Sequence, residues 1–578
     1  GIAACTGQLA SQVSSASDTR TINFNKGGTL TSFTYSGLST AQQAYFTPSK
    51  LSQWSSTFSA SDKIAATGDT LVNFLRGQTQ YESQTGSTAN LYRHRLAILG
   101  DIVDTSPAFL GAPTFTYTDP GYDAWANSST QQGRAKTIFA GANDGMLHAF
   151  NAATGVERWA FVPSPVMTNM YWLADLTYTT NHHFYVDGAL VTSDVCVSNC
   201  SDATKADWRT ILMGGLNGGG RGYYAMDVTD PTTPKMLWEF TSLNDADLGY
   251  SFGNPLAVKK SDGTWVIAVT SGYDNVALGN NDPYDADGSG QGFLFLLDPL
   301  TGKVLSKIGT STGSKTTPSG LGKISFWADN PSLDATALYA YGGDLLGNLW
   351  RFDINAGTVL QIAAFTDGSS NPQSITTRPE LAKVNGNRVV YIGTGKYLEA
   401  SDLDSTKFTT QSIYAIVDNG TTVKTPRTAL VQQTLTDAKP NRTITNAAVT
   451  IKPPSVMGWF VDFPDSGERN NVDISLVLGT LIVPTNVPTN GICEAGGYSY
   501  LNYLNYTSGS YVPGASSAGV WTGNDLTTGI TVVWVKGKPV IIRTGSNSGA
   551  QVENGNFSPI GKGGVTGHRV SWREVISK

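Results

Sequence analysis

Short apolar runs separated by polar turns dominate the chain from about residue 97 onward. Each run carries β-branched or aromatic residues and is followed by a turn rich in Gly, Asn and Asp, a pattern typical of β-strands. The clearest example is residues 137–161, TIFAGANDGMLHAFNAATGVERWAF, where three strands alternate with two glycine-containing turns. The pattern predicts an all-β protein.

The order of strand, glycine turn, strand and polar turn recurs six times. In each recurrence an Asn or Asp ends a strand, and we interpret these residues as turn formers whose side chains cap nearby backbone N–H groups. The six residues are Asn151, Asp227, Asp298, Asp353, Asp418 and Asn505. Their spacing exceeds the roughly 40 to 45 residues of a compact four-stranded propeller blade, so we expect blades with long loop insertions.

A last strand at 531–544 is expected to complete a seventh blade with the segment from Asp101 to Phe109. Joining the two ends of the chain in one blade would remove the final exposed sheet edges. The predicted fold is therefore an all-β, seven-bladed β-propeller of the quinoprotein-like type over residues 97–578.

Residues 1–96 have a weaker pattern and are expected to form a short, partly helical lead-in that packs on the propeller. One helix is predicted at about 61–76, where Ser61 and Asp62 precede a face of apolar residues. That face comprises Ile64, Leu71, Val72 and Leu75.

Composition agrees with a folded, turn-rich β protein. The 578 residues are 40% hydrophobic and 15% charged, and they include 63 glycines, which supply turn conformations. The formal charge of −6, without a basic cluster, argues against nucleic acid as a partner. No apolar run reaches the ~18 residues of a transmembrane helix, so none is predicted. The first ten residues do not resemble a signal peptide, so we expect any such peptide to have been removed or to lie upstream.

The chain has four cysteines: Cys5, Cys196, Cys200 and Cys493. Cys196 and Cys200 flank a short polar segment, where a disulfide would cross-link the tip of a loop in an oxidising compartment. Half of a zinc site with His182 and His183, or free thiols, are the alternatives. The pairing of the other two cysteines stays open.

An oxygen-rich loop at 280–293, NNDPYDADGSGQGF, is the first-choice calcium site. Acidic and hydroxyl side chains alternate before Gly290, as in the first half of an EF-hand loop, but no acid stands at the twelfth position. The expected ligands are Asp282, Asp285, Asp287, Ser289 and the carbonyl of Gln291. The alternative is a solvated Asp-Gly turn.

No catalytic motif stands out, and no enzyme activity is expected. The chain lacks an H-E-x-x-H helix and a P-loop. The glycine-rich segment 214–222, GGLNGGGRG, lies between two strands and opens no helix, so we interpret it as a blade turn. The pair His182 and His183 is interpreted as a polar loop.

Several stretches, in the same order along the chain, resemble the C-terminal domain of the PilY/PilC family of type IV pilus tip proteins. They are LVNFLRGQ (71–78), LGDIVDTSPAFLG (99–111), GANDGMLHAF (141–150), ILMGGLNGGGRGYYAMDVTDP (211–231), YGGDLLGNLWRFDI (341–354), GWFVDFPDSGER (458–469), CEAGG (493–497) and RVSWREV (569–575). Together they span most of residues 70–575.

The resemblance implies a non-enzymatic adhesin at the pilus tip or outer membrane that supports pilus assembly, adhesion, twitching motility and virulence. Such proteins are secreted through the periplasm and act with minor pilins, whereas the ligand on a host or other surface is not implied. The family carries a von Willebrand A-like region upstream of the propeller, which this sequence lacks, so the chain is expected to be a C-terminal fragment.

The resemblance also implies a second-choice calcium loop just before the strand that leads into GGDLLGN. Here Asp329, Asn330 and Asp334 remain as candidate ligands, while Phe326 and Ala328 stand where the family has two carboxylates. Two other functions stay open, a quinone-dependent dehydrogenase and a propeller lectin. The adjacent cysteines that line the quinone in such dehydrogenases have no counterpart here.

Overall fold

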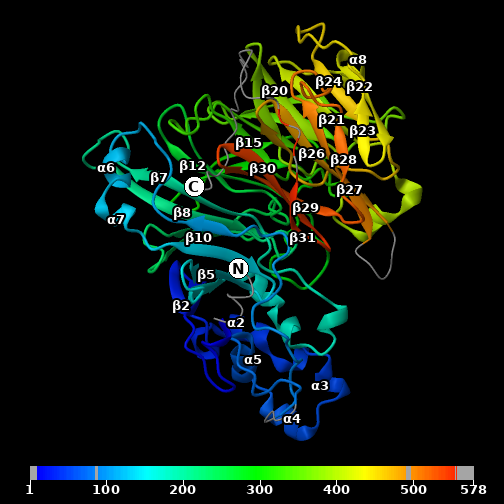
Figure 1. The fold of residues 1–578 in the computed structure, drawn as a ribbon. Helices are drawn as coiled ribbons and strands as arrows, with labels where there is room; N and C mark the ends of the chain where they lie inside the picture. The colour runs from blue at the N-terminus through cyan, green and yellow to red at the C-terminus, as the bar shows by residue number, and fades with distance from the viewer. Residues whose placement is uncertain (1–8, 85–88, 490–495, 554, 556, 558–578) are drawn as a thin grey trace.

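The fold was analysed in a computed structural model of the chain, which describes residues 9–84, 89–489, 496–553, 555 and 557. Cys5, Cys493 and the closing stretch 569–575 lie outside the described residues. Strands dominate (Figure 1), and within the described residues they form six sheets, of which three have four strands. The fold is therefore mostly β, as the sequence predicts.

Four units of four antiparallel strands follow one another along the chain, and within each unit the strands pair in sequential order. The first contains β3 (Ala108–Leu110), β4 (Thr137–Ala142), β5 (Met146–Asn151) and β6 (Glu157–Val162). The second contains β7 (Leu190–Ser198), β8 (Asp207–Gly215), β9 (Gly222–Asp227) and β10 (Lys235–Thr241). The third contains β11 (Leu256–Lys259), β12 (Trp265–Thr270), β13 (Phe293–Leu297) and β14 (Val304–Gly309). The fourth contains β15 (Ile324–Trp327), β16 (Tyr339–Gly343), β17 (Asn348–Asp353) and β18 (Thr358–Ala364).

Two further four-stranded units belong to one ten-stranded sheet. The fifth unit comprises β19 (Glu380–Val384), β20 (Asn387–Gly393), β21 (Ser412–Asp418) and β24 (Gly458–Asp462). The sixth comprises β25 (Ser475–Val477), β26 (Thr480–Pro488), β27 (Gly497–Asn505) and β28 (Gly519–Trp521). The hairpin β22 (Val431–Ala438) and β23 (Asn441–Ile444) joins them, because β22 pairs in parallel with β24 and β23 pairs with β28.

The six repeat residues occupy one equivalent position in these units. Each ends or directly follows the third strand of its unit, and its side-chain oxygen accepts a hydrogen bond from the backbone N–H two residues on. The residues are Asn151, Asp227, Asp298, Asp353, Asp418 and Asn505. Their predicted role as turn formers is thereby confirmed.

Tryptophans connect successive units at these turns. The indole N–H of Trp159, in the fourth strand of the first unit, donates to the carbonyl of Pro231 at 2.8 Å. Trp238 makes the same bond to Pro299 one unit later, at 3.0 Å. A buried indole needs an acceptor, and the turn after each third strand supplies one, so the turn residues also hold neighbouring units together.

The C-terminal strands form a separate three-stranded sheet of β29 (Thr527–Val535), β30 (Lys538–Gly545) and β31 (Gly549–Glu553). The predicted pairing of 531–544 with the segment ending at Phe109 is wrong. Phe109 pairs with Ile138 of β4, and strand β30 lies between β29 and β31. With only three strands in this last sheet, seven blades remain a prediction.

The N-terminal lead-in joins the first unit directly. Strand β1 (Ile22–Lys26) pairs in parallel with β6, and β2 (Thr29–Ser32) adds a sixth strand to the sheet. Arg20 forms a buried ion pair with Glu157 at 2.7 Å. The boundary predicted at 96/97 therefore separates two segments that share one sheet and one core.

Short helices complete the lead-in, and several lie together at the lower end of the molecule in Figure 1. They are α2 (Thr40–Gln43), α3 (Gln53–Ser56), α4 (Ala60–Ala65) and α5 (Gly68–Leu75), with the 3₁₀ turns η1 (Tyr35–Gly37), η2 (Ala44–Phe46) and η3 (Pro48–Lys50). The single helix predicted at 61–76 is wrong: Thr67 caps a second helix through a capping box with Thr70, so the chain makes two helices. Ile64 is 80% exposed, whereas Leu71 and Leu75 are buried.

The remaining helices lie in loops between strands. They are α6 (Tyr122–Ala126), α7 (Ser129–Gln132) and α8 (Pro426–Ala429), and the 3₁₀ turns η4 (Ser164–Thr168), η5 (Met170–Ala174), η6 (Tyr178–Thr180), η7 (Ala400–Leu403) and η8 (Ser405–Lys407). Turns η4 to η6 fill the connection from β6 to β7, and they contribute to the site described next.

Candidate functional site

The first-choice calcium loop, between β12 and β13, is held by a buried ion pair. Arg221 Nη2 lies 3.2 Å from Asp285 Oδ1, and the two side chains are only 4% and 6% exposed. Arg221 also donates to the carbonyls of Val276 and Ala286. Because the carboxylate already has a cation and backbone donors around it, Asp285 is structurally engaged rather than free.

The other four predicted ligands also have protein partners. Asp287 pairs with Lys315 (2.6 Å), Ser289 donates to Asp247 (2.7 Å), Asp282 accepts from the Tyr284 N–H and the Thr168 hydroxyl, and the Gln291 carbonyl accepts from Asn275 (2.8 Å). These partners lie on different segments, so the five candidate ligands are directed toward different neighbours.

The second-choice loop lies before β16 and is more exposed. Asp334 is 51% exposed at its side chain and pairs with Lys259 at 2.9 Å. Asp329 accepts a hydrogen bond from the Trp327 indole, and Asn330 accepts one from the Ser332 hydroxyl. The three candidates therefore also have separate partners.

Neither loop offers a ready-made calcium site in this arrangement. Ca²⁺ takes six to eight oxygen ligands, and carboxylates that bind it must turn toward a common point. In the part of the chain that the structure describes, no three His, Cys, Asp or Glu side chains gather as a metal site would require. The predicted ligands, as arranged, do not fit the ion without exchanging their present partners.

The two cysteines of the polar loop are joined. Cys196 lies in β7, and the structure links it to Cys200 as a disulfide with a Cα–Cα distance of 5.8 Å. The bond closes the turn between β7 and β8, next to the side chain of Trp208, which pairs across from Cys196. It lies on a different loop from the pocket described below.

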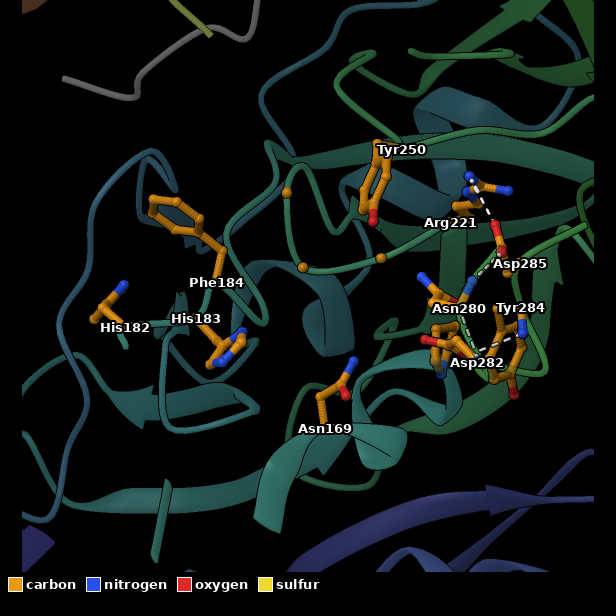
Figure 2. A pocket seen from close by; sticks show the side chains of 14 residues that line it. Asn169, His182, His183, Phe184, Arg221, Tyr250, Asn280, Asp282, Tyr284 and Asp285 are labelled. Carbon is orange, nitrogen blue, oxygen red and sulfur yellow. Dashed lines mark hydrogen bonds and ion pairs between the residues drawn. The ribbon is translucent and has the colours of Figure 1, made fainter. Parts of the chain in front are cut away.

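A cavity of about 210 Å³ brings together three segments that the sequence presents separately. They are the histidine pair with Phe184, the glycine-rich turn 218–221 and the oxygen-rich loop 280–285. Figure 2 shows the histidine segment on one side and Asn280 to Asp285 on the other, with Tyr250 and Asn169 pointing into the space between them.

The glycine-rich turn is shaped by close packing. A Cβ atom on Gly219 would lie 1.7 Å from the carbonyl oxygen of Tyr185, so only glycine fits there. The turn connects β8 to β9 and leads into Arg221, whose guanidinium is 5.4 Å from the centre of the Tyr250 ring. The predicted role of 214–222 as a blade turn is confirmed, and the same turn also forms one wall of the pocket.

Burial sets the protonation of the pocket's rings. Desolvation, with a contribution from neighbouring His182, lowers the pKa of His183, so this imidazole is neutral at pH 7. Desolvation also raises the pKa of the Tyr250 hydroxyl and keeps it protonated. The pocket therefore presents the neutral rings of His183 and Tyr250 beside the ion pair of Arg221 and Asp285.

Sequence reasoning missed Asn169 and Tyr250, and it did not join the three segments. The order of the repeats did contain a signal that two of these segments lie side by side. The turn 218–221 and the loop 280–285 both follow the second strand of their units, so they occupy equivalent positions in neighbouring units. Loops at equivalent positions of a repeat protein lie on one face, which is where such proteins place binding surfaces.

The repeated four-stranded units and a pocket formed by loops of neighbouring units define a β-propeller with a loop-built site on one face. A family model described as the PilY1 beta-propeller domain matches residues 99–370. Residues 99–370 of the chain therefore belong to the PilY1 beta-propeller domain family.

Curated relatives agree with this assignment. The chain is 33% identical over 542 residues to the "Type IV pilus biogenesis factor PilY1 homolog" of Xylella fastidiosa, covering 89% of this chain and 41% of the relative. It is also 33% identical over 501 residues to PilY1 of Pseudomonas aeruginosa, covering 76% and 41%. The chain thus spans about two fifths of the length of these relatives.

A solved structure supports the same assignment. The crystal structure of the Pseudomonas aeruginosa PilY1 C-terminal domain matches with a TM-score of 0.58 and 26% identity, over 78% of this chain and 100% of that domain. The helices among the described residues are each too short or too polar to span a bilayer.

Proposed function

We propose that the chain is the propeller part of a type IV pilus biogenesis factor at the bacterial surface, and that it acts by binding rather than by catalysis. The observation that carries the proposal is its 33% identity to factors of that description over more than 500 residues. Minor pilins at the pilus tip are the proposed partners inside the pilus. Adhesion through the loops of one propeller face is the proposed role outside it.

The proposal is tested in the source bacterium by removing the codons for residues 99–553 in frame, with the rest of the gene left intact. We expect surface pili, counted by electron microscopy, and the twitching zone to fall to the level of a full gene deletion. Restoring the complete gene should return both. Normal pilus numbers in the truncated strain, with the truncated protein present at the wild-type amount, would contradict the proposal.

Calcium assistance is a further part of the proposal and rests on the oxygen-rich loop 280–291. An ion there would have to replace Arg221 at Asp285 and Lys315 at Asp287, so the affinity is expected to be weak. Values near 10⁻⁴ to 10⁻³ M, roughly those of extracellular calcium modules, are the expectation. The titration that tests it is described in the Discussion.

A further inference from the structure

The pocket contains polar groups that the described residues leave unused. The side-chain amide of Asn169 and the hydroxyl of Tyr250 make no hydrogen bond to any described residue, and both point into the cavity (Figure 2). The amide nitrogen of Asn280 is likewise without an acceptor there, while its oxygen receives the Asp282 N–H. An amide offers a donor and an acceptor together, and a hydroxyl does the same.

The pocket offers little net charge to a ligand. Arg221 and Asp285 neutralise each other at 3.2 Å, and Arg221 also donates hydrogen bonds to two backbone carbonyls. Asp282 is the remaining lining carboxylate, and it accepts hydrogen bonds from the Thr168 hydroxyl and the Tyr284 N–H. An anionic ligand would therefore meet no free Lys or Arg among the lining residues, which argues against phosphate.

Aromatic surface lies beside these polar groups. Phe184 is 43% exposed at the edge of the cavity, and the ring of His183 packs on Trp172 with centroids 5.2 Å apart. Tyr250 contributes another ring, with its polar end toward the cavity. Aromatic rings next to amide groups suit a ligand that is apolar on one side and rich in hydroxyls around its rim. The rings can pack on the apolar side, while the amides hydrogen-bond to the hydroxyls.

We propose that this pocket binds one neutral saccharide unit. The hydroxyls of the sugar pair with the Asn169 and Asn280 amides, the Asp282 carboxylate and the Tyr250 hydroxyl, and its C–H face packs on Phe184. A cavity of about 210 Å³ accommodates a single monosaccharide rather than a nucleotide or a long peptide. The proposal rests on the proposed function, because it names the ligand class through which the chain would act by binding.

The test uses the purified chain and four neutral probes: glucose, galactose, mannose and N-acetylglucosamine. Binding is followed by saturation-transfer NMR on the sugar and by the total tryptophan fluorescence, to which Trp172 beside the pocket ring of His183 contributes. Sodium phosphate and ethylammonium chloride serve as an anionic and a cationic probe. We expect saturable binding of at least one sugar and none of either ion.

Two substitutions locate the binding without disturbing the fold. Asn169→Ala and Tyr250→Phe each remove one unpaired polar group, and each should raise Kd about three- to tenfold, the effect of one lost hydrogen bond. Asn441→Ala is the matched control, since Asn441 is exposed on β23, outside the pocket. It should bind as the wild type does.

Three outcomes overturn the proposal: no sugar binds, phosphate or ethylammonium binds instead, or both pocket variants keep the wild-type Kd. Sugar binding is measured on the purified chain, whereas pilus assembly is measured in cells. A chain that binds no sugar while its deletion still abolishes pili refutes the saccharide and leaves the proposed function standing.

Discussion

Two loops of similar composition play different parts in this propeller. Both the loop 280–291 and the loop 329–334 are acidic, and each keeps part of a calcium-ligand pattern. In the first, Asp285 is buried against Arg221 and lines a pocket. In the second, Asp334 is half exposed and shares Lys259 with Asp119, and no pocket residue comes from this loop.

The difference shows that the neighbour of a carboxylate, rather than its spacing along the chain, decides its role. A buried carboxylate paired with a buried guanidinium fixes loop shape, because either charge left alone would be costly to bury. An exposed pair contributes little, since water and salt screen it. Substitutions and a calcium titration that compare the two loops test this contrast.

Asp285→Asn should be the most damaging of these changes. It leaves the buried guanidinium of Arg221 without its counter-charge, and the expected loss in unfolding free energy is about 3 to 5 kcal/mol. Chemical denaturation of the purified chain measures it.

The matched control is Asp334→Asn, which makes the same chemical change in the exposed loop. Lys259 keeps Asp119 as a partner, so the loss should be no more than about 1 kcal/mol. Equal losses for the two variants would remove the distinction between the loops.

Calcium should have a smaller effect, and only through the first loop. If Kd lies near 10⁻³ M, about 10 mM calcium should stabilise the wild type by about 1.4 kcal/mol, seen as a rise in Tm. The rise should disappear in the double variant Asp285→Ala with Asp287→Ala. It should persist when Asp329 and Asp334 are both replaced by Ala. The reverse result would move the site to the second loop.

The smallest expected effect is a pH dependence carried by His183. Burial holds the pKa of this imidazole below its ordinary value near 6.5, with His182 adding to the shift. The unfolded chain therefore binds a proton more readily, so stability from this site is present above about pH 6.5 and falls as the pH drops below it. Melting curves between about pH 7 and 5 should show a smaller decline in His183→Gln. If the variant loses as much stability as the wild type between these pH values, the pH dependence comes from other groups.

The repeat pattern was sufficient to predict most of the fold. The residues that end the third strands, from Asn151 to Asn505, mark the units because an Asx turn depends on local sequence. One failure was local, because the break at Thr67 depends on a capping box with Thr70 that competes with helix continuation. The other was non-local: the C-terminal strand pairs with its own neighbours rather than with Phe109.

The candidate site was less predictable for the same reason. Asp285 and Ser289 stand at the spacing of calcium ligands, but their partners Arg221 and Asp247 lie dozens of residues away. In the sequence, Asn169 looks like any other polar loop residue, so nothing indicates that its amide lacks a partner. Only the arrangement of neighbouring units brings it opposite Tyr250.

Hydrogen–deuterium exchange of the purified chain, with and without the saccharide that binds, tests the central claim most directly. The claim is that one pocket on one face of the propeller is the binding site. We predict slower exchange in 182–184, 218–221 and 280–285 when the sugar is present, and no change in 329–334. Protection that appears in 329–334, or nowhere in the three pocket segments, would contradict it.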